Sequence, residues 1–390
     1  MRHAVPRGFF DGAAAPALLA AAALAAFAAS GPRVRAARRA RNPAPALSSA
    51  HRASDARASA LVDFASVALG GFRGVLADAL WLRAGRMQDE RRFVELVQLS
   101  DWVTELEPRN EDVWIFHAWN MAYNVSFLLS RADDRWRWVG NGIALLRDRG
   151  IPLNPRSAAL KQALGWFFQH KVGLPDDELS PYYRTAWARE AAAYLAADGS
   201  APEEGSFSEE ELGEALRMDA GAMRELEARF GPVDWRVPWA SSLYWGWLGA
   251  ADAAAAGRDE LPCRRMVYQS LMAMARGGGR LAAPPEGEDW SFDEAARPNP
   301  ALAPGAIAYT EDCMEASDFS GIRFAYAYFL RDMVGLALLE GREADARAYY
   351  GRLAGFFEAR GLGAEMPAFE DLPAADPEFV ADLLDRAGLK

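Results

Sequence analysis

Histidines and cysteines are the side chains best suited to metal binding or nucleophilic catalysis, and this chain of 390 residues contains four histidines and two cysteines. They are His3, His51, His117, His170, Cys263 and Cys313. No histidine has a second histidine or a carboxylate at the spacing of a helical metal site, and the cysteines form no CxxC pair. The GxSxG, Walker-loop and GxGxxG motifs do not occur in the sequence. The sequence therefore predicts no catalytic residue, no metal site and no cofactor.

Two of the histidines lie in predicted helices, and both have a structural interpretation. His117 sits in an apolar helix, which favours a hydrogen-bonded histidine of the core over a metal ligand. His170 precedes Lys171 at a helix end, where a positive charge interacts favourably with the helix dipole. Carboxylates are numerous because the chain is acidic, with 54 Asp and Glu against 43 Lys and Arg. We interpret them as solvated helix faces rather than as general acid and base pairs.

Two asparagines are spaced as a pair. Asn120 and Asn124 lie at positions i and i+4 of the segment AWNMAYN, and Tyr123 lies between them. This spacing places both amides on one side of an otherwise apolar helix. Since buried amides need hydrogen-bond partners, they either tie down a neighbouring loop or line a groove and hold the backbone of a ligand. All three residues are candidate contacts for a partner.

The densest aromatic cluster lies between residues 235 and 247. Its members are Trp235, Trp239, Tyr244, Trp245 and Trp247. Aromatic side chains fill gaps between imperfectly matched helices, which favours a core role for the cluster. The alternative is an aromatic platform for a sugar chain or an extended peptide, with Trp235 and Trp239 as candidate contacts.

The asparagine pair and the aromatic cluster both lie on predicted helices. Alanine is abundant and β-branched residues are sparse, which favours helix over strand. The stretch 72–124 contains two apolar-periodic segments separated by a short polar break, and the second stops at Pro108. A third periodic segment opens near Trp114. This order is typical of a helical hairpin followed by another helix. The pattern predicts an irregular loop at 277–316. It predicts helices at 58–87, 91–107, 111–129, 135–149, 157–170, 177–197, 208–230, 238–256, 261–276, 319–340, 343–358 and from 377 onward. The first of these is one long helix or two short ones with a break near Gly70 and Gly71.

The segment EGREADARAYYGRL (Glu340–Leu353) resembles the turn and second helix of a tetratricopeptide repeat. Gly341 stands at the turn position and Ala346 at the helix crossing. Pro108 resembles the proline that ends such a repeat, whereas the first hairpin has Leu96 at the crossing. The resemblance implies an all-α fold, a degenerate solenoid of antiparallel helical hairpins whose inner face binds peptides or protein segments. The segments WxxxLEPRN, AWNMAYN and PVDWRVPWASSLYW are also similar to a group of uncharacterised bacterial membrane-anchored proteins of this type.

The N-terminus carries an uncharged stretch at residues 12–30, between a tail at 1–11 and an arginine-rich flexible linker at 31–57. As a helix the stretch would extend about 28 Å, close to the thickness of a bilayer core, and we interpret it as a single transmembrane anchor. A cleaved signal peptide and a peripheral tail are the alternatives.

The distribution of charge predicts the orientation of the anchor and the kind of partner that each part of the chain can bind. The stretch is followed by Arg33, Arg35, Arg38, Arg39 and Arg41, which favours a cytoplasmic body by the positive-inside rule, with the periplasmic side as the alternative. Residues 1–57 hold nine Arg and two Asp, a net charge of +7, so the rest of a chain of net charge −11 carries −18. An acidic body argues against a nucleic-acid partner, and a basic arm suits a membrane surface.

The anchor and linker therefore precede a helical repeat domain at residues 58–276, an irregular loop at 277–316, and a C-terminal hairpin with a closing helix at 317–390. This organisation predicts a membrane-anchored scaffold, rather than an enzyme, that binds a protein or peptide of unknown identity on a tetratricopeptide-like concave surface. The alternative is a cell-envelope enzyme or glycan-binding protein that uses residues 235–247 and the loop at 277–316.

Overall fold

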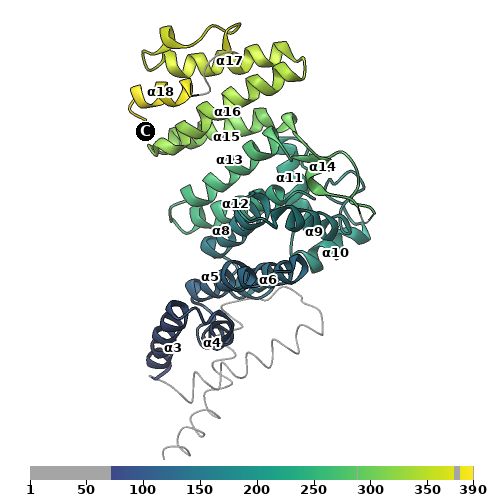
Figure 1. The fold of residues 1–390 in the computed structure, drawn as a ribbon, viewed down its shortest axis with the longest axis vertical. Coiled ribbons are helices and arrows are strands. Elements are labelled where there is room, and N and C mark those ends of the chain that lie inside the picture. Colours follow the sequence, from purple (N-terminus) through teal and green to yellow (C-terminus); the bar gives the residue numbers. More distant parts are fainter. Residues whose placement is uncertain (1–71, 288, 373–377, 390) are drawn as a thin grey trace, which may run out of the picture. The chain divides into compact units, whose positions relative to one another are not determined.

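A computed structural model describes residues 72–287, 289–372 and 378–389 (Figure 1). Helices make up nearly all of the regular structure in these ranges, so the prediction of an all-α fold is confirmed. No helix in the described part of the chain combines the length and the apolar character that a bilayer crossing needs. The predicted anchor at 12–30 and the linker at 31–57 lie outside the described residues.

The chain divides into two compact units, residues 1–113 and residues 114–390. In the first unit, α3 (Phe72–Asp89) and α4 (Phe93–Leu106) pack against each other as an antiparallel hairpin. The stripe of α4 that the periodicity predicts is buried, with Leu96 0% and Val103 2% exposed. The helix ends ahead of Pro108, as a proline at that position requires.

The second unit begins within α5. The remaining α-helices in chain order are α5 (Glu111–Trp119), α6 (Ala132–Ala144), α7 (Ile151–Leu153), α8 (Ala158–Trp166), α9 (Ser180–Ala192), α10 (Phe207–Ala215), α11 (Ala220–Phe230), α12 (Pro238–Ala255), α13 (Leu261–Arg276), α14 (Phe292–Ala295), α15 (Ala303–Ala316), α16 (Ser320–Leu339), α17 (Glu343–Glu358) and α18 (Phe379–Arg386). Short 3-10 helices are η2 (Ser126–Leu128), η5 (Pro300–Leu302) and η6 (Gly363–Glu365). The predicted bounds of α13 and α17 are those that the structure shows.

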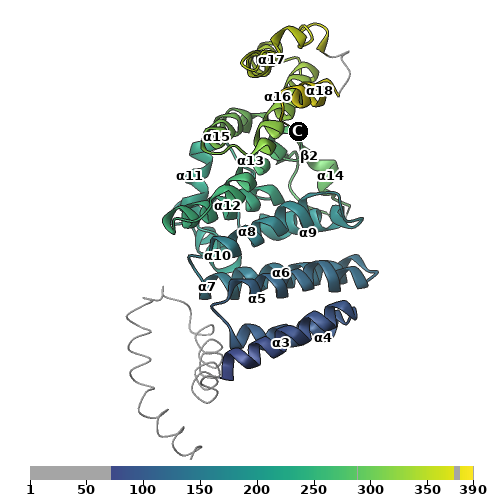
Figure 2. The same ribbon diagram turned by 90° about the vertical axis from the view of Figure 1, so that its left-hand side faces the viewer.

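The helices of the second unit pack on one another in succession (Figure 2). The helix α8 packs on α12, α12 packs on α13, α13 packs on α15 and α16, and α16 packs on α17. The core lies along these contacts and includes Trp114, Phe167, Tyr268 and Phe329, each at most 1% exposed. Each helix therefore buries its apolar face against its neighbours rather than in one central core.

Two predicted segments differ from the structure. The single helix expected at 208–230 is two helices, α10 and α11, because Arg217 adopts a positive φ of 54° and Asp219 caps α11 by accepting a hydrogen bond from Ala222 N at 2.8 Å. The segment 277–316 is not irregular throughout. It contains a two-stranded antiparallel sheet of β1 (Arg280–Leu281) and β2 (Ala296–Arg297), followed by α15. The prolines favoured the prediction of a loop, but Pro304 lies in the first turn of α15, where a helix tolerates proline.

Three helices of the second unit change from α to π geometry before they end. These π-helical segments are η1 (Asn120–Val125), η3 (Leu145–Gly150) and η4 (Phe167–Gly173). A π-helix contains an extra residue per turn, which turns the side chains that follow to a different side, and such segments are rare and concentrated at functional sites. Apolar periodicity does not predict them. The side chains of η1 and η4 are therefore candidates for a functional site.

Candidate functional site

Four aromatic side chains of the second unit form a partly exposed row, here called the aromatic strip: Trp119, Tyr123, Trp166 and His170. The ring of Trp119 stacks on Tyr123 with centroids 4.0 Å apart, and His170 stacks on Trp166 with centroids 4.7 Å apart. The two stacks meet where Tyr123 Oη lies 3.4 Å from His170 Nδ1. Trp119 is 40% exposed, and the other three rings are half-buried. The π-helical segments η1 and η4 supply Tyr123 and His170.

The predicted asparagine pair lies beside this strip. Asn124 Nδ2 donates a hydrogen bond to Asn120 Oδ1 at 3.0 Å. Asn120 is 1% exposed and Asn124 is half-buried. The bond between them uses part of the hydrogen-bonding capacity that a ligand or loop would need. Of the three predicted contacts in this segment, the half-buried Tyr123 is the one that belongs to the aromatic strip.

A buried ionic network lies behind the strip, and its centre is the carboxylate of Asp177. Lys171 Nζ donates to Asp177 Oδ2 at 2.6 Å, Tyr183 Oη donates to the same oxygen at 3.2 Å, and Arg135 Nη1 lies 3.5 Å from Oδ1. Burial by itself raises the pKa of Asp177, but the bonds from Lys171 and from a backbone N–H outweigh it and hold that pKa below its usual value. The ammonium of Lys171 also lies 5.1 Å from the ring centroid of Tyr123, which ties the network to the strip.

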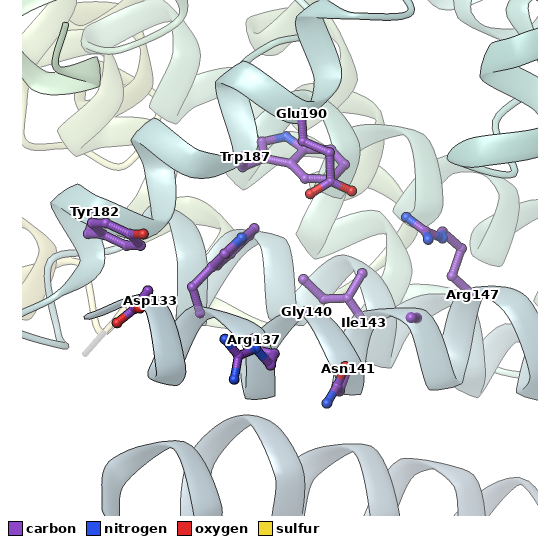
Figure 3. Close-up of a pocket in the computed structure, with 11 residues that line it drawn as sticks. Asp133, Arg137, Gly140, Asn141, Ile143, Arg147, Tyr182, Trp187 and Glu190 are labelled. Atoms are coloured by element: carbon purple, nitrogen blue, oxygen red, sulfur yellow. The ribbon is translucent and has the colours of Figure 1, made fainter. Parts of the chain in front are cut away.

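A groove of about 420 Å³ lies between α6 and α9, here called the α6–α9 groove (Figure 3). Its lining residues are Asp133, Trp136, Arg137, Gly140, Asn141, Ile143, Ala144, Arg147, Tyr182, Trp187 and Glu190. Figure 3 shows Glu190 and Trp187 projecting from one helix and Arg147 and Ile143 from the other. This size is within the range of about 300–1,000 Å³ that small-ligand pockets cover, so the groove has room for side chains of a bound segment.

A chain of contacts connects the groove to the aromatic strip. Trp136, which lines the groove, stacks on Tyr183 with centroids 5.9 Å apart. Tyr183 Oη in turn belongs to the network at Asp177, whose Lys171 lies over Tyr123 of the strip. The buried hydrogen bonds at Asp177 therefore support one residue of each surface, Trp136 of the groove and Tyr123 of the strip.

At one end of the groove, the lining residues Asp133 and Arg137 each contact a neighbour of opposite charge. Arg131 donates two hydrogen bonds to Asp133, at 3.1 and 3.0 Å. Arg137 Nη1 donates to Asp134 Oδ1 at 3.1 Å. Each formal charge at this end therefore has an opposite charge in contact with it, and the end offers no net charge to a ligand.

At the other end, one charge is paired and one is not. Arg147 makes a two-point contact with Asp148, Nε to Oδ1 at 2.9 Å and Nη2 to Oδ2 at 3.0 Å. Glu190 has no ion pair and no side-chain hydrogen bond within the described residues. Protein atoms that displace water around its carboxylate raise the pKa of Glu190, with Arg147 opposing and Asp148 reinforcing the shift.

The predicted Trp235–Trp247 cluster is mainly core. Trp235 is 2% exposed and its indole N–H donates to Glu227 Oε1 at 2.6 Å, so it has no face to offer to a sugar or peptide. Trp239 is half-buried, and its ring lies so close to Gly173 that an added Cβ there would approach it to 3.0 Å. The aromatic platform predicted as an alternative therefore lacks one of its two candidate contacts.

The segment that follows α13 is held against the body rather than left free. Arg184 donates two hydrogen bonds of 2.8 Å each to the carboxylate of Asp293 and a third, of 3.0 Å, to the carbonyl of Gly173. Asp234 accepts a hydrogen bond from Leu281 N at 2.8 Å. These contacts hold Leu281 of β1 and Asp293 of α14 against the rest of the second unit.

The two histidines of the second unit differ in their surroundings. His117 is fully buried, as predicted, and burial, with a smaller effect from Arg149, lowers its pKa to about 4. His170 does more than complement a helix end, because its Nε2 lies 3.2 Å from Asp176 Oδ2 and its ring belongs to the aromatic strip. Within the described residues no three His, Cys, Asp or Glu side chains are grouped as a metal site.

Sequence reasoning missed most of this site. Trp119, Trp166, Lys171 and Asp177 carry no motif, and their roles depend on neighbours distant in the chain. No family model, no curated protein and no solved structure matches the chain. The resemblance to tetratricopeptide repeats therefore stays a prediction, and function has to be inferred from the side chains themselves.

Proposed function

We propose that this protein is a membrane-anchored interaction module of tetratricopeptide-like hairpins that binds an extended segment of a partner protein on its second unit. The observation that carries the proposal is the aromatic strip, four stacked and partly exposed rings beside the α6–α9 groove. Aromatic side chains are enriched at the centres of protein interfaces, where they contribute a large contact area.

The rigidity of the strip supports a binding role. Trp119 is fixed by its stack on Tyr123, and Tyr123 packs edge-on against the buried Phe167 with centroids 5.6 Å apart. A ring that is immobile before binding loses little conformational entropy when a partner covers it. The strip therefore has the character of a preorganised contact surface rather than of a loose surface side chain.

The anchor is the second part of the proposal. Residues 12–30 would hold the protein at a membrane, with Arg33, Arg35 and their neighbours near anionic headgroups and the body on the cytoplasmic side. Confinement near the membrane raises the effective concentration of the module for partners in the same membrane. A weak contact at the strip would then be sufficient for function.

Site-specific photocrosslinking of the full-length protein in its own membrane tests the proposal. A benzoylphenylalanine introduced at Trp119 is expected to crosslink to a discrete protein. The matched control places it at Leu339, which is 88% exposed on α16, away from the strip and groove. We expect no such product from the control.

A second variant links the product to the strip. Tyr123→Ala, combined with the crosslinker at Trp119, removes the ring on which Trp119 stacks and is expected to reduce the product several-fold. Equal products from positions 119 and 339, or no product from position 119, would contradict the proposal.

A further inference from the structure

Among the described residues that line the α6–α9 groove with a charge, Glu190 is the one without an ion pair or a side-chain hydrogen bond. Asp133, Arg137 and Arg147 line the groove and are each paired with a neighbour, whereas Glu190 is not. The guanidinium of Arg147 presents its Nε and Nη2 edge to Asp148, so that edge is not available for a carboxylate of a ligand. The groove is therefore prepared for a cation rather than for an anion.

The walls beside Glu190 suit a cation as well. Trp136, Tyr182 and Trp187 line the same groove, and Figure 3 shows Trp187 next to Glu190 and Tyr182 beside Asp133 at the other end. Trp187 is 2% exposed, so the aromatic surface that a ligand can reach belongs to the half-buried Trp136 and the exposed Tyr182. Aromatic faces attract ammonium and guanidinium groups, and the attraction is worth about 0.5–2 kcal/mol depending on solvent exposure. A carboxylate among aromatic rings is the arrangement that recognises a basic side chain, whose aliphatic stem packs on the rings while its charged end reaches the oxygen atoms.

We infer that the α6–α9 groove binds a lysine or arginine side chain of the partner segment, with the Glu190 carboxylate accepting hydrogen bonds from its charged end. The inference rests on the proposed function, and it adds the chemical class of the partner. Long-range charge agrees with it, because residues 58–390 carry a net charge of −18 and attract a basic segment.

The test uses four fluorescein-labelled peptide mixtures with the same random flanks of Gly, Ala, Ser and Leu. Two central positions are Lys, Arg, Glu or norleucine, so that norleucine keeps the length of the lysine stem without its charge. Fluorescence anisotropy measures binding to the full-length protein in non-ionic detergent micelles. Each mixture is tested on the wild type, on Glu190→Gln and on Glu214→Gln. The last variant removes an exposed carboxylate of α10 outside the groove lining.

The Lys and Arg mixtures are expected to bind the wild type about 10- to 100-fold more tightly than the norleucine mixture, the factor that corresponds to a hydrogen bond between charged groups. Glu190→Gln is expected to remove most of that preference, and Glu214→Gln to retain it. A preference for the Glu mixture would overturn the inference. A Lys preference that survives Glu190→Gln undiminished would also overturn it, because the Glu190 carboxylate would then not contribute to the preference.

Two outcomes separate the inference from the proposed function. If the norleucine mixture binds as tightly as the Lys mixture and Glu190→Gln changes nothing, the protein binds peptides but not by a basic side chain in this groove. If none of the four mixtures binds the wild type, both the inference and the peptide-binding role are overturned.

Discussion

Two helical hairpins, α3–α4 in the first unit and α16–α17 in the second, use the same turn with different residues. The turns are Glu90–Arg92 and Glu340–Arg342, and the middle residue of each adopts a left-handed conformation, with φ of 56° at Arg91 and 71° at Gly341. Glycine adopts that region without steric cost, whereas arginine does not. The two turns therefore have the same backbone conformation, which is strained at Arg91 and unstrained at Gly341.

The hydrogen bonds of the two turns explain how this is possible. Arg92 N donates to Met87 O at 2.9 Å, and Arg342 N donates to Ala337 O at 2.7 Å, so each turn closes over the last turn of the preceding helix. These bonds satisfy backbone groups that a helix end otherwise leaves open. The backbone bonds define the turn, and the middle residue sets only how much strain it contains.

The same arginine ion pairs recur in both turns. Arg92 contacts Glu90 at 3.1 Å, two residues before it, and Glu95 at 3.3 Å, three residues after it. Arg342 contacts Glu340 at 2.7 Å and an aspartate three residues after it at 2.5 Å. The repetition is a sequence pattern, Glu-x-Arg-x-x-acid, which neither helical periodicity nor the position of glycine reveals.

The hairpins differ most at the position six residues after the turn's first glutamate. It is Leu96 in one and Ala346 in the other, and both are 0% exposed. A large and a small side chain fill the same position completely only if the neighbouring helix is placed differently around each. We therefore expect the two hairpins to share the turn and to differ in the spacing of their helices.

The largest effect is expected from Leu96→Ala. The cavity left by a fully buried leucine should lower the free energy of unfolding of the α3–α4 hairpin by about 2–5 kcal/mol. Hydrogen exchange of the α3 and α4 amides measures it within the full chain. The control is Val94→Ala, because Val94 is 53% exposed and should change little. Equal effects at positions 94 and 96 would show that position 96 is not the crossing.

A smaller loss is expected from Ala346→Leu, which gives the second hairpin the residue of the first. Overfilling a buried position should cost the α16–α17 hairpin about 1–3 kcal/mol. Exchange rates of the α16 and α17 amides report it, with the exposed Ala348→Leu as the matched control. A neutral result at position 346 would mean that the two hairpins share one helix spacing.

Exchanging the middle turn residues should give opposite signs. Arg91→Gly relieves left-handed strain and is expected to stabilise the first hairpin by about 0.5–1 kcal/mol, whereas Gly341→Ala should destabilise the second by about 1 kcal/mol. A Cβ at Gly341 meets no atom within 4 Å, so backbone strain alone causes the loss. Amide exchange of the two hairpins in parallel is the measurement, and shifts of the same sign would refute the strain argument.

The smallest effect is expected from Arg342→Gln. The ion pairs of Arg342 are partly exposed, so their loss should lower hairpin stability by only a few tenths of a kcal/mol. Comparison of the variant with the wild type at low and at high salt checks this, because salt screens exposed pairs and should abolish the difference. A difference that persists at high salt would assign the arginine a packing role.

Helical periodicity predicted most of the elements because it depends on neighbours in the chain. The bounds of α13 and α17, the buried stripe with Leu96, and the burial of Trp114 and His117 all followed from it. Its errors lie at proline and at turns, where Pro304 starts a helix and Arg217 ends one without glycine. A proline can lie in a loop or in the first turn of a helix, and an arginine can lie within a helix or just after its end, so residue type alone does not decide between these positions.

The candidate site was predicted only in part. Asn120, Tyr123 and Asn124 were located near it by their spacing, and Trp235, for which a core role was favoured and a surface platform was the alternative, lies in the core. Glu190 gave no signal, since an unpaired carboxylate looks like any other glutamate until its neighbours are known. The π-helical segments were invisible for a related reason, because the extra residue per turn is stabilised by packing rather than by a residue pattern.

The amino-acid sequence by itself determined that this protein is helical, where most helices start and stop, and which faces are apolar, because these properties arise from residues three or four positions apart. Only the tertiary structure decided that Arg135 meets Asp177, which is 42 residues away, and that α6 and α9 enclose a groove. Such contacts depend on how helices cross, and crossing is set by side-chain volumes on two surfaces at once.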